Sequence, residues 1–186
     1  MEKHIKESRS FEVRAANEPN DMMVEGYAVV FESPQTYEYT EIIDRNALNG
    51  TDMNDCVLRY NHSEEGFSLA RTRNRSMELT IDNNGLFVRA RIIDTQHGRD
   101  LYKMIQEGLV DKMSFAFTVS REEWDDETKT RRILEIDKLY DVSAVDQPFY
   151  ENTSIFARTL ADYEKEVEQK KLALEKEKML MLINLK

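Results

Sequence analysis

The sequence has few of the residues that define several common protein classes. Cys56 is its single cysteine, which excludes an internal disulfide framework and is typical of a reducing compartment. The longest apolar run, 179–183, is far shorter than the roughly 20 residues needed to span a bilayer. The first eight residues lack the apolar core of a signal peptide. These absences predict a soluble intracellular protein with no membrane contact.

Basic residues are too few to balance the acidic ones. The chain has 26 Lys and Arg against 36 Asp and Glu, a net charge of −10 at pH 7. Residues 159–186 contain six of each sign, so the whole acidic excess falls on residues 1–158. A body with this field repels the phosphates of nucleic acids. We therefore expect no DNA or RNA partner, whereas basic or neutral polypeptides remain open.

Patterns of apolar residues divide the 186-residue chain into a β-rich domain, 1–158, and a helical tail, 159–186. From Leu160 onward there is no glycine or proline, and good helix formers dominate, which predicts a long C-terminal helix. A second helix is expected between Thr95 and Gly108, with Asp94 or Thr95 as its N-cap. The expected strands are 11–15, 24–31, 56–60, 77–81, 86–92, 112–119, 132–136 and 139–145.

The remaining segments are predicted to connect these elements. Residues 32–55 are expected to form an irregular stretch with one short helix at 45–48, and residues 121–130 a polar loop that contains the only tryptophan. The segment 82–85, Asp-Asn-Asn-Gly, predicts a tight hairpin turn because Asn and Gly accept positive φ.

Within the strand around Ser114, alternate side chains should point to opposite faces. Large apolar side chains occupy one face, and Ser114, Ala116 and Thr118 occupy the other. A serine on this small, polar face could meet a substrate. On the later strand, Asp141 is expected to share a face with three residues: Leu139, Ser143 and Val145.

The candidate chemistry is that of a serine nucleophile. A serine hydroxyl needs a nearby base, and histidine is the usual one. Of the three histidines, His4 lies near the terminus, and His97 lies near a helix start where the dipole disfavours its protonated form. Elimination leaves His62 as the candidate base, with Ser114 as candidate nucleophile and Asp141 as candidate carboxylate.

Each of these residues also has a purely structural interpretation. His62 could be a surface loop residue, Ser114 a strand serine with local hydrogen bonds, and Asp141 a solvated strand residue. No glycine-framed nucleophile elbow is present, which argues against an α/β-hydrolase. A metal site of His62, Glu64 and Glu65 lacks the usual ligand spacing, and no glycine-rich phosphate loop occurs, so no cofactor is expected.

An ordered series of short segments adds to the evidence of these single residues. The segments are 26–31 (GYAVVF), 41–43 (EII), 61–62 (NH), 69–71 (LAR), 82–86 (DNNGL), 108–117 (GLVDKMSFAF) and 139–145 (LYDVSAV). Together they resemble the prohead, or capsid maturation, serine protease family of tailed bacteriophages, which is related to the herpesvirus assemblins. The resemblance covers about residues 10–158.

The resemblance implies an α+β fold, a closed or nearly closed, mainly antiparallel β-barrel surrounded by a few helices. It implies Ser114 as nucleophile and His62 as base. Assemblins use a second histidine as third member, whereas the phage branch has an acidic residue, which Asp141 matches here. Three other carboxylates are rivals for that place: Glu135, Asp137 and Asp146.

The implied substrates are scaffold segments and scaffold-like extensions of the major capsid protein, together with the protease itself. They are cut inside the assembling prohead in the host cytoplasm. The tail helix could contact scaffold or shell, and a homo-oligomer is left open. Two other functions stay in consideration. One is a catalytically inactive scaffold or structural capsid-assembly protein on the same fold, and the other is a serine esterase or amidase for small molecules.

Overall fold

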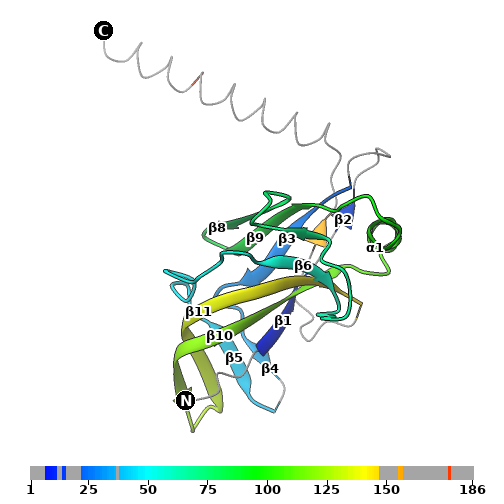
Figure 1. Ribbon diagram of the computed structural model, residues 1–186. Coiled ribbons are helices and arrows are strands. Elements are labelled where there is room, and N and C mark those ends of the chain that lie inside the picture. The colour runs from blue at the N-terminus through cyan, green and yellow to red at the C-terminus, as the bar shows by residue number, and fades with distance from the viewer. Residues whose placement is uncertain are drawn as a thin grey trace.

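The computed structural model describes residues 7–11, 14–15, 22–36, 38–146, 155–156 and 176. These residues are mostly β, and their hydrogen-bonded ladders form two sheets of seven and five strands. Among residues 22–146 as described, one segment is an α-helix, α1 (Gln96–Gln106). Figure 1 shows the two sheets and the position of α1 beside them. No helix in this described part is long and apolar enough to cross a membrane.

The seven-stranded sheet is built around one long hairpin. Its strands are β1 (Glu7–Phe11), β4 (Gln35–Thr36), β5 (Thr40–Ile43), β6 (Val57–Tyr60), β7 (Ala70–Arg71), β10 (Lys112–Asp125) and β11 (Thr130–Val145). β10 and β11 pair antiparallel along their length, and their tip extends to the bottom of Figure 1. β11 also pairs in parallel with β5 near its start and with β6 near its end. Because β6 pairs with the last part of β11, the end of β6 lies beside the end of β11.

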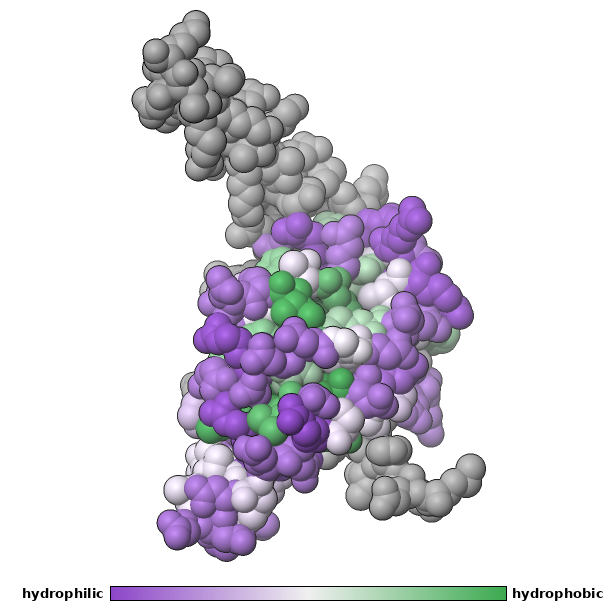
Figure 2. All heavy atoms as spheres, turned by 90° about the vertical axis from the view of Figure 1, so that its left-hand side faces the viewer, coloured by the Kyte–Doolittle hydropathy of each residue, from purple (hydrophilic) through white to green (hydrophobic). Residues whose placement is uncertain are grey.

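The five-stranded sheet contains a second hairpin. Its strands are β2 (Arg14–Ala15), β3 (Met23–Val30), β8 (Met77–Ile81), β9 (Gly85–Arg91) and β12 (Ile155–Phe156). Side chains of both sheets join in one buried apolar cluster, for example Phe115 and Leu139 from the first sheet and Leu86 and Val88 from the second. The face of the molecule in Figure 2 is largely hydrophilic, with apolar side chains gathered in a small central area. The two sheets therefore share one buried apolar core.

Most expected elements are confirmed, and several expectations need correction. The helix agrees with the sequence patterns, including the Thr95 N-cap, whose hydroxyl accepts from the Gly98 amide at 3.1 Å, and the positive φ of Gly108. The strands before 121 also agree, except the one expected at 11–15: Phe11 ends β1 of one sheet, and Arg14–Ala15 form β2 of the other. The strands expected at 132–136 and 139–145 are parts of the single strand β11. The stretch 45–48 forms turns instead of a helix, and the stretch 32–55 contains β4 and β5. Residues 121–130 are mostly strand, not loop.

The expected barrel is also corrected, because the described strands form two separate ladders and no closed ring. A few helices are expected around the barrel, and the described part of residues 22–146 contains one, α1. The tail helix from Leu160 and the domain boundary at 158 and 159 lie outside the described residues, apart from Lys176.

The turn of the second hairpin uses its glycine differently from the expectation. Gly85 does not have a positive φ. Instead, the Asp82 carboxylate accepts hydrogen bonds from the amides of Asn84 and Gly85 at 2.7 and 3.0 Å. A Cβ on Gly85 would lie 1.8 Å from the carbonyl oxygen of Val29, since β9 begins against β3. Glycine is needed here for close approach of two strands.

Gly85→Ala is therefore expected to destabilise the protein by about 3 kcal/mol, because β9 must move away from β3 to admit the methyl group. The free energy of unfolding in urea measures this loss. Gly108→Ala is the matched control. Nothing lies within 4 Å of its Cβ position, and only the left-handed backbone, at φ +70°, costs about 1 kcal/mol. Equal losses for both variants would contradict the steric explanation.

Candidate active site

His62 lies in a tight turn directly after β6. The Ser63 amide donates to the Tyr60 carbonyl at 3.1 Å, and the two central residues, Asn61 and His62, have φ of 50° and 54°. This is the pattern of a type I′ turn. Asn tolerates the left-handed region, whereas a histidine there costs roughly 1 to 2 kcal/mol. Among the described residues, five other non-glycine residues also have a positive φ, so the turn alone assigns no role to His62.

Hydrogen bonds fix this turn to the end of β11. The Asn61 amide donates to the Ala144 carbonyl at 2.9 Å, and the Asn61 side-chain oxygen accepts from the Asp146 amide at 3.2 Å. On the other side, the Arg59 guanidinium donates to the Ser63 carbonyl at 2.7 Å. The turn is thus held at both of its ends, and the imidazole is directed over β11.

The imidazole of His62 contacts the carboxylate of Asp141. His62 Nδ1 lies 2.6 Å from Asp141 Oδ1, and the Asp141 side chain is 1% exposed against 23% for His62. An ionised carboxylate can only accept hydrogen bonds, so Nδ1 carries the proton of the neutral ring. Nε2 then has the lone pair that a general base requires. The pair has the geometry of a histidine held in the catalytic tautomer.

Strand register brings Ser114 to the same place. In the pairing of β10 with β11, Ser114 lies opposite Ser143, and Ala116 lies opposite Asp141. Directly opposed residues point to the same face with Cβ atoms about 5 Å apart. The structure therefore gathers all three sequence candidates, Ser114, His62 and Asp141, on one face of the sheet.

Two details of this face differ from the sequence expectation. Ser114 is only 2% exposed, because β10 is an inner strand flanked by β1 and β11. Asp141 does not share a face with Leu139. The register passes from Ala116 opposite Asp141 to Phe117 opposite Leu139, so Tyr140 is an extra residue at a bulge. The bulge puts Leu139 in the core and Asp141 on the face of Ser114.

Ser143, which the sequence patterns did not single out, is part of this arrangement. Its hydroxyl donates to Asp141 Oδ1 at 2.8 Å and accepts from the His62 amide at 3.2 Å. The alternation of the strand does place Ser143 beside Asp141, but a contact with the turn of His62 depends on the parallel pairing of β6 with β11. That pairing has no local signal in the sequence.

The rival carboxylates are engaged elsewhere. Asp146 accepts from the Tyr60 hydroxyl at 3.0 Å, and Asp137 lies 3.5 Å from the Thr118 hydroxyl. Glu135 forms an ion pair with Arg121 at 2.9 Å. Of the four carboxylates considered, Asp141 is thus the one whose contact with the His62 ring is observed.

The other histidines do not compete with His62. The ring of His97 packs against Phe67, with centroids 4.8 Å apart, and His4 lies outside the described residues. Over the described ranges, no group of three or more His, Cys, Asp or Glu side chains is arranged to hold a metal ion, and the set of His62, Glu64 and Glu65 is included in that finding.

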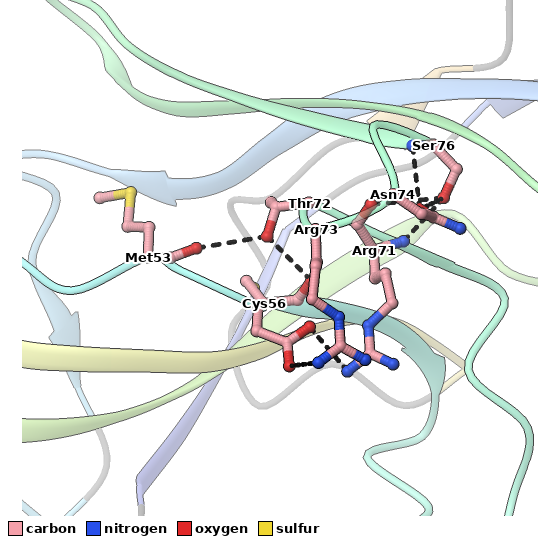
Figure 3. Close-up of polar contacts among 8 residues, drawn as sticks. Met53, Cys56, Arg71, Thr72, Arg73, Asn74 and Ser76 are labelled. Atoms are coloured by element: carbon pink, nitrogen blue, oxygen red, sulfur yellow. Dashed lines mark hydrogen bonds and ion pairs between the residues drawn. The ribbon is translucent and has the colours of Figure 1, made fainter.

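Cys56 precedes β6 and is anchored with it. The Thr72 amide donates to the Cys56 carbonyl at 3.0 Å, and the Thr72 hydroxyl reaches the carbonyls of Met53 and Cys56, as Figure 3 shows. Burial raises the pKa of the Cys56 thiol far above its ordinary value, and the charge of Asp141 raises it further. A neutral, buried thiol is a poor nucleophile, so Cys56 does not compete with Ser114.

The site can thus present a serine hydroxyl, an imidazole base and an orienting carboxylate on one sheet face. A search of curated proteins gave no match. Among solved structures, the bacteriophage T4 capsid assembly protease gp21 has a similar fold, with a TM-score of 0.54 and 17% identity, over 77% of this chain and 97% of that one. The sequence matches the caudovirus prohead serine protease family over residues 9–166. The chain therefore belongs to this family of phage serine proteases that act in capsid maturation.

Proposed function

We propose that the protein cleaves scaffold segments and scaffold-like extensions of the major capsid protein, and also itself, inside the assembling prohead. Ser114 is the nucleophile, His62 the general base, and Asp141 the group that orients the imidazole. The observation that supports this proposal most is the 2.6 Å contact between His62 Nδ1 and a buried Asp141, next to a serine in register. Membership of a serine protease family supplies the reaction class.

The reaction proceeds by acyl transfer. The Nε2 atom of neutral His62 takes the proton of the Ser114 hydroxyl as its oxygen attacks the carbonyl carbon of the scissile peptide bond. The imidazolium then gives this proton to the leaving amine, and the peptide bond breaks to leave an acyl-enzyme. Water, deprotonated by the same imidazole, attacks the carbonyl carbon of the ester. The bond from this carbon to the Ser114 oxygen then breaks, the new carboxyl end leaves, and the imidazolium returns the proton to Ser114.

The carboxylate supports each of these proton transfers. Asp141 is buried, so its charge acts on the ring of His62 through little water. Its hydrogen bond keeps the proton on Nδ1 in the ground state and stabilises the imidazolium that forms during attack. The restrained turn at Asn61 and His62 keeps the ring from leaving this position.

Co-expression tests the proposed substrate. The protein is produced together with the major capsid protein of the same phage, and we expect the capsid protein to be shortened at a defined bond, which mass spectrometry locates. The fragments should vanish with Ser114→Ala and persist with Thr118→Val, a control for a buried hydroxyl on the same strand. An intact capsid protein, in the presence of an enzyme that hydrolyses small esters, would contradict the proposed substrate and favour an esterase.

A further inference from the structure

We infer that Ser143 is a positioning residue of the catalytic site, an inference that rests on the proposed function. Its hydroxyl forms hydrogen bonds to both Asp141, on β11, and His62, in the turn after β6. One hydrogen bond, of 2.8 Å, reaches the carboxylate of Asp141, and the other, of 3.2 Å, comes from the backbone amide of His62. Ser143 therefore fixes the carboxylate and the turn of the histidine with respect to each other.

The hydrogen bonds converge on a single oxygen. Asp141 Oδ1 accepts from both the Ser143 hydroxyl and the His62 ring, at 2.8 and 2.6 Å. Without Ser143, rotation of the carboxylate about its side-chain bond could turn Oδ1 away from the ring. The hydroxyl thus selects the rotamer of Asp141 in which its oxygen faces Nδ1.

The contact with the backbone of His62 is equally specific. The left-handed conformation of His62 points its amide toward β11, where the Ser143 oxygen accepts it. Because this conformation is strained, the hydrogen bond offsets part of its cost. An alanine at 143 would remove this acceptor from the His62 amide, and the turn could relax.

Ser143 is not itself suited to be the nucleophile. Its proton is donated to Asp141, and its oxygen accepts from the amide of His62. Ser114 lies on the neighbouring strand in direct register with Ser143 and is the serine that the proposed function assigns to attack. The two serines in this register pair thus have different tasks, attack for Ser114 and alignment for Ser143.

Labelling with a fluorophosphonate, a reagent that phosphonylates activated serines with loss of fluoride, tests this assignment on the full chain. The inactivation rate kinact should fall about 10- to 100-fold in Ser143→Ala while KI stays unchanged, because a shift of about 1 Å in a catalytic group costs about 100-fold in rate. Ser143→Thr, which keeps the hydroxyl, should restore kinact to within about threefold. Thr118→Val, another buried hydroxyl on this sheet face, should label like the unchanged protein.

The possible failures are distinguishable. If Ser114→Ala takes up no label while Ser143→Ala has a normal kinact, the role of Ser143 is overturned and Ser114 remains the proposed nucleophile. Mass spectrometry that finds the label on Ser143 would overturn both. If the threonine variant does not fold, Ser143→Cys serves instead. It keeps a donor, though a weaker one on a larger atom, and its kinact is expected to fall between those of serine and alanine. A value equal to that of alanine or serine contradicts the inference.

Discussion

Replacement of Ser114 by alanine is expected to lower peptide-bond cleavage by about four or more orders of magnitude. Under the proposed mechanism, the variant loses the oxygen that attacks the substrate. Cys56 is buried with a raised thiol pKa, and the Ser143 hydroxyl is committed to Asp141. The residual rate would come from the remaining binding and electrostatic groups of the site. The fold should be retained, since only one side-chain atom is removed.

The measurement is the rate at which purified protein cuts a peptide that spans the bond located in the capsid protein. Fluorophosphonate labelling of the same samples gives an independent reading, because Ser114→Ala should take up no label. Thr118→Val again controls for the loss of a hydroxyl on β10. Retention of more than about 1% of the cleavage rate by Ser114→Ala would show that another group attacks the substrate.

Strand alternation alone accounts for much of the site. A period of two in β10 separates Ser114 from Phe115 and Phe117, and the structure confirms that the two phenylalanines stack in the core, with ring centroids 4.6 Å apart. His62 could also be found from the sequence, since a chain with three histidines leaves few alternatives. The assignment of the two faces of β10 succeeds because it depends on local order along one segment, whereas the catalytic roles of Ser114 and His62 stay predictions.

Contacts between distant segments could not be predicted in the same way. Simple alternation along β11 predicts that Asp141 and Leu139 point to the same face. The extra residue at the bulge, Tyr140, instead turns Leu139 to the opposite face. The sequence has no local mark of this bulge. The type I′ turn at His62 was likewise missed, because one of its two left-handed residues is not of the type that favours such a turn.

The segment after Ser120 forms strands, although its many charged residues predict a loop. In the structure these charges pair between strands. Arg131 contacts Glu122 across the hairpin and also Glu41 of β5, at 3.0 Å, where both side chains are largely buried. Arg121 pairs with Glu135. Opposite charges that face each other stabilise a sheet, so high polarity did not exclude strands here.

Asp141→Asn is expected to lower the cleavage rate by about 10⁴-fold while leaving peptide binding nearly unchanged. The amide is nearly isosteric, so the turn of His62 and the bond from Ser143 can persist. It carries no charge, however, and cannot stabilise the imidazolium. If its NH₂ group turns toward the ring, Nδ1 must accept, and the proton moves to Nε2, where it blocks attack.

The rival carboxylates supply the controls for this substitution. Asp137→Asn and Asp146→Asn should keep rates within about threefold, because these side chains contact Thr118 and Tyr60. Peptide cleavage at saturating substrate gives kcat for each variant, and the concentration dependence gives KM. A large loss in Asp137→Asn or Asp146→Asn, with Asp141→Asn active, would move the third member of the triad to that carboxylate. The 2.6 Å contact with His62 would then be structural, and the histidine would need another partner to hold its tautomer during proton transfer.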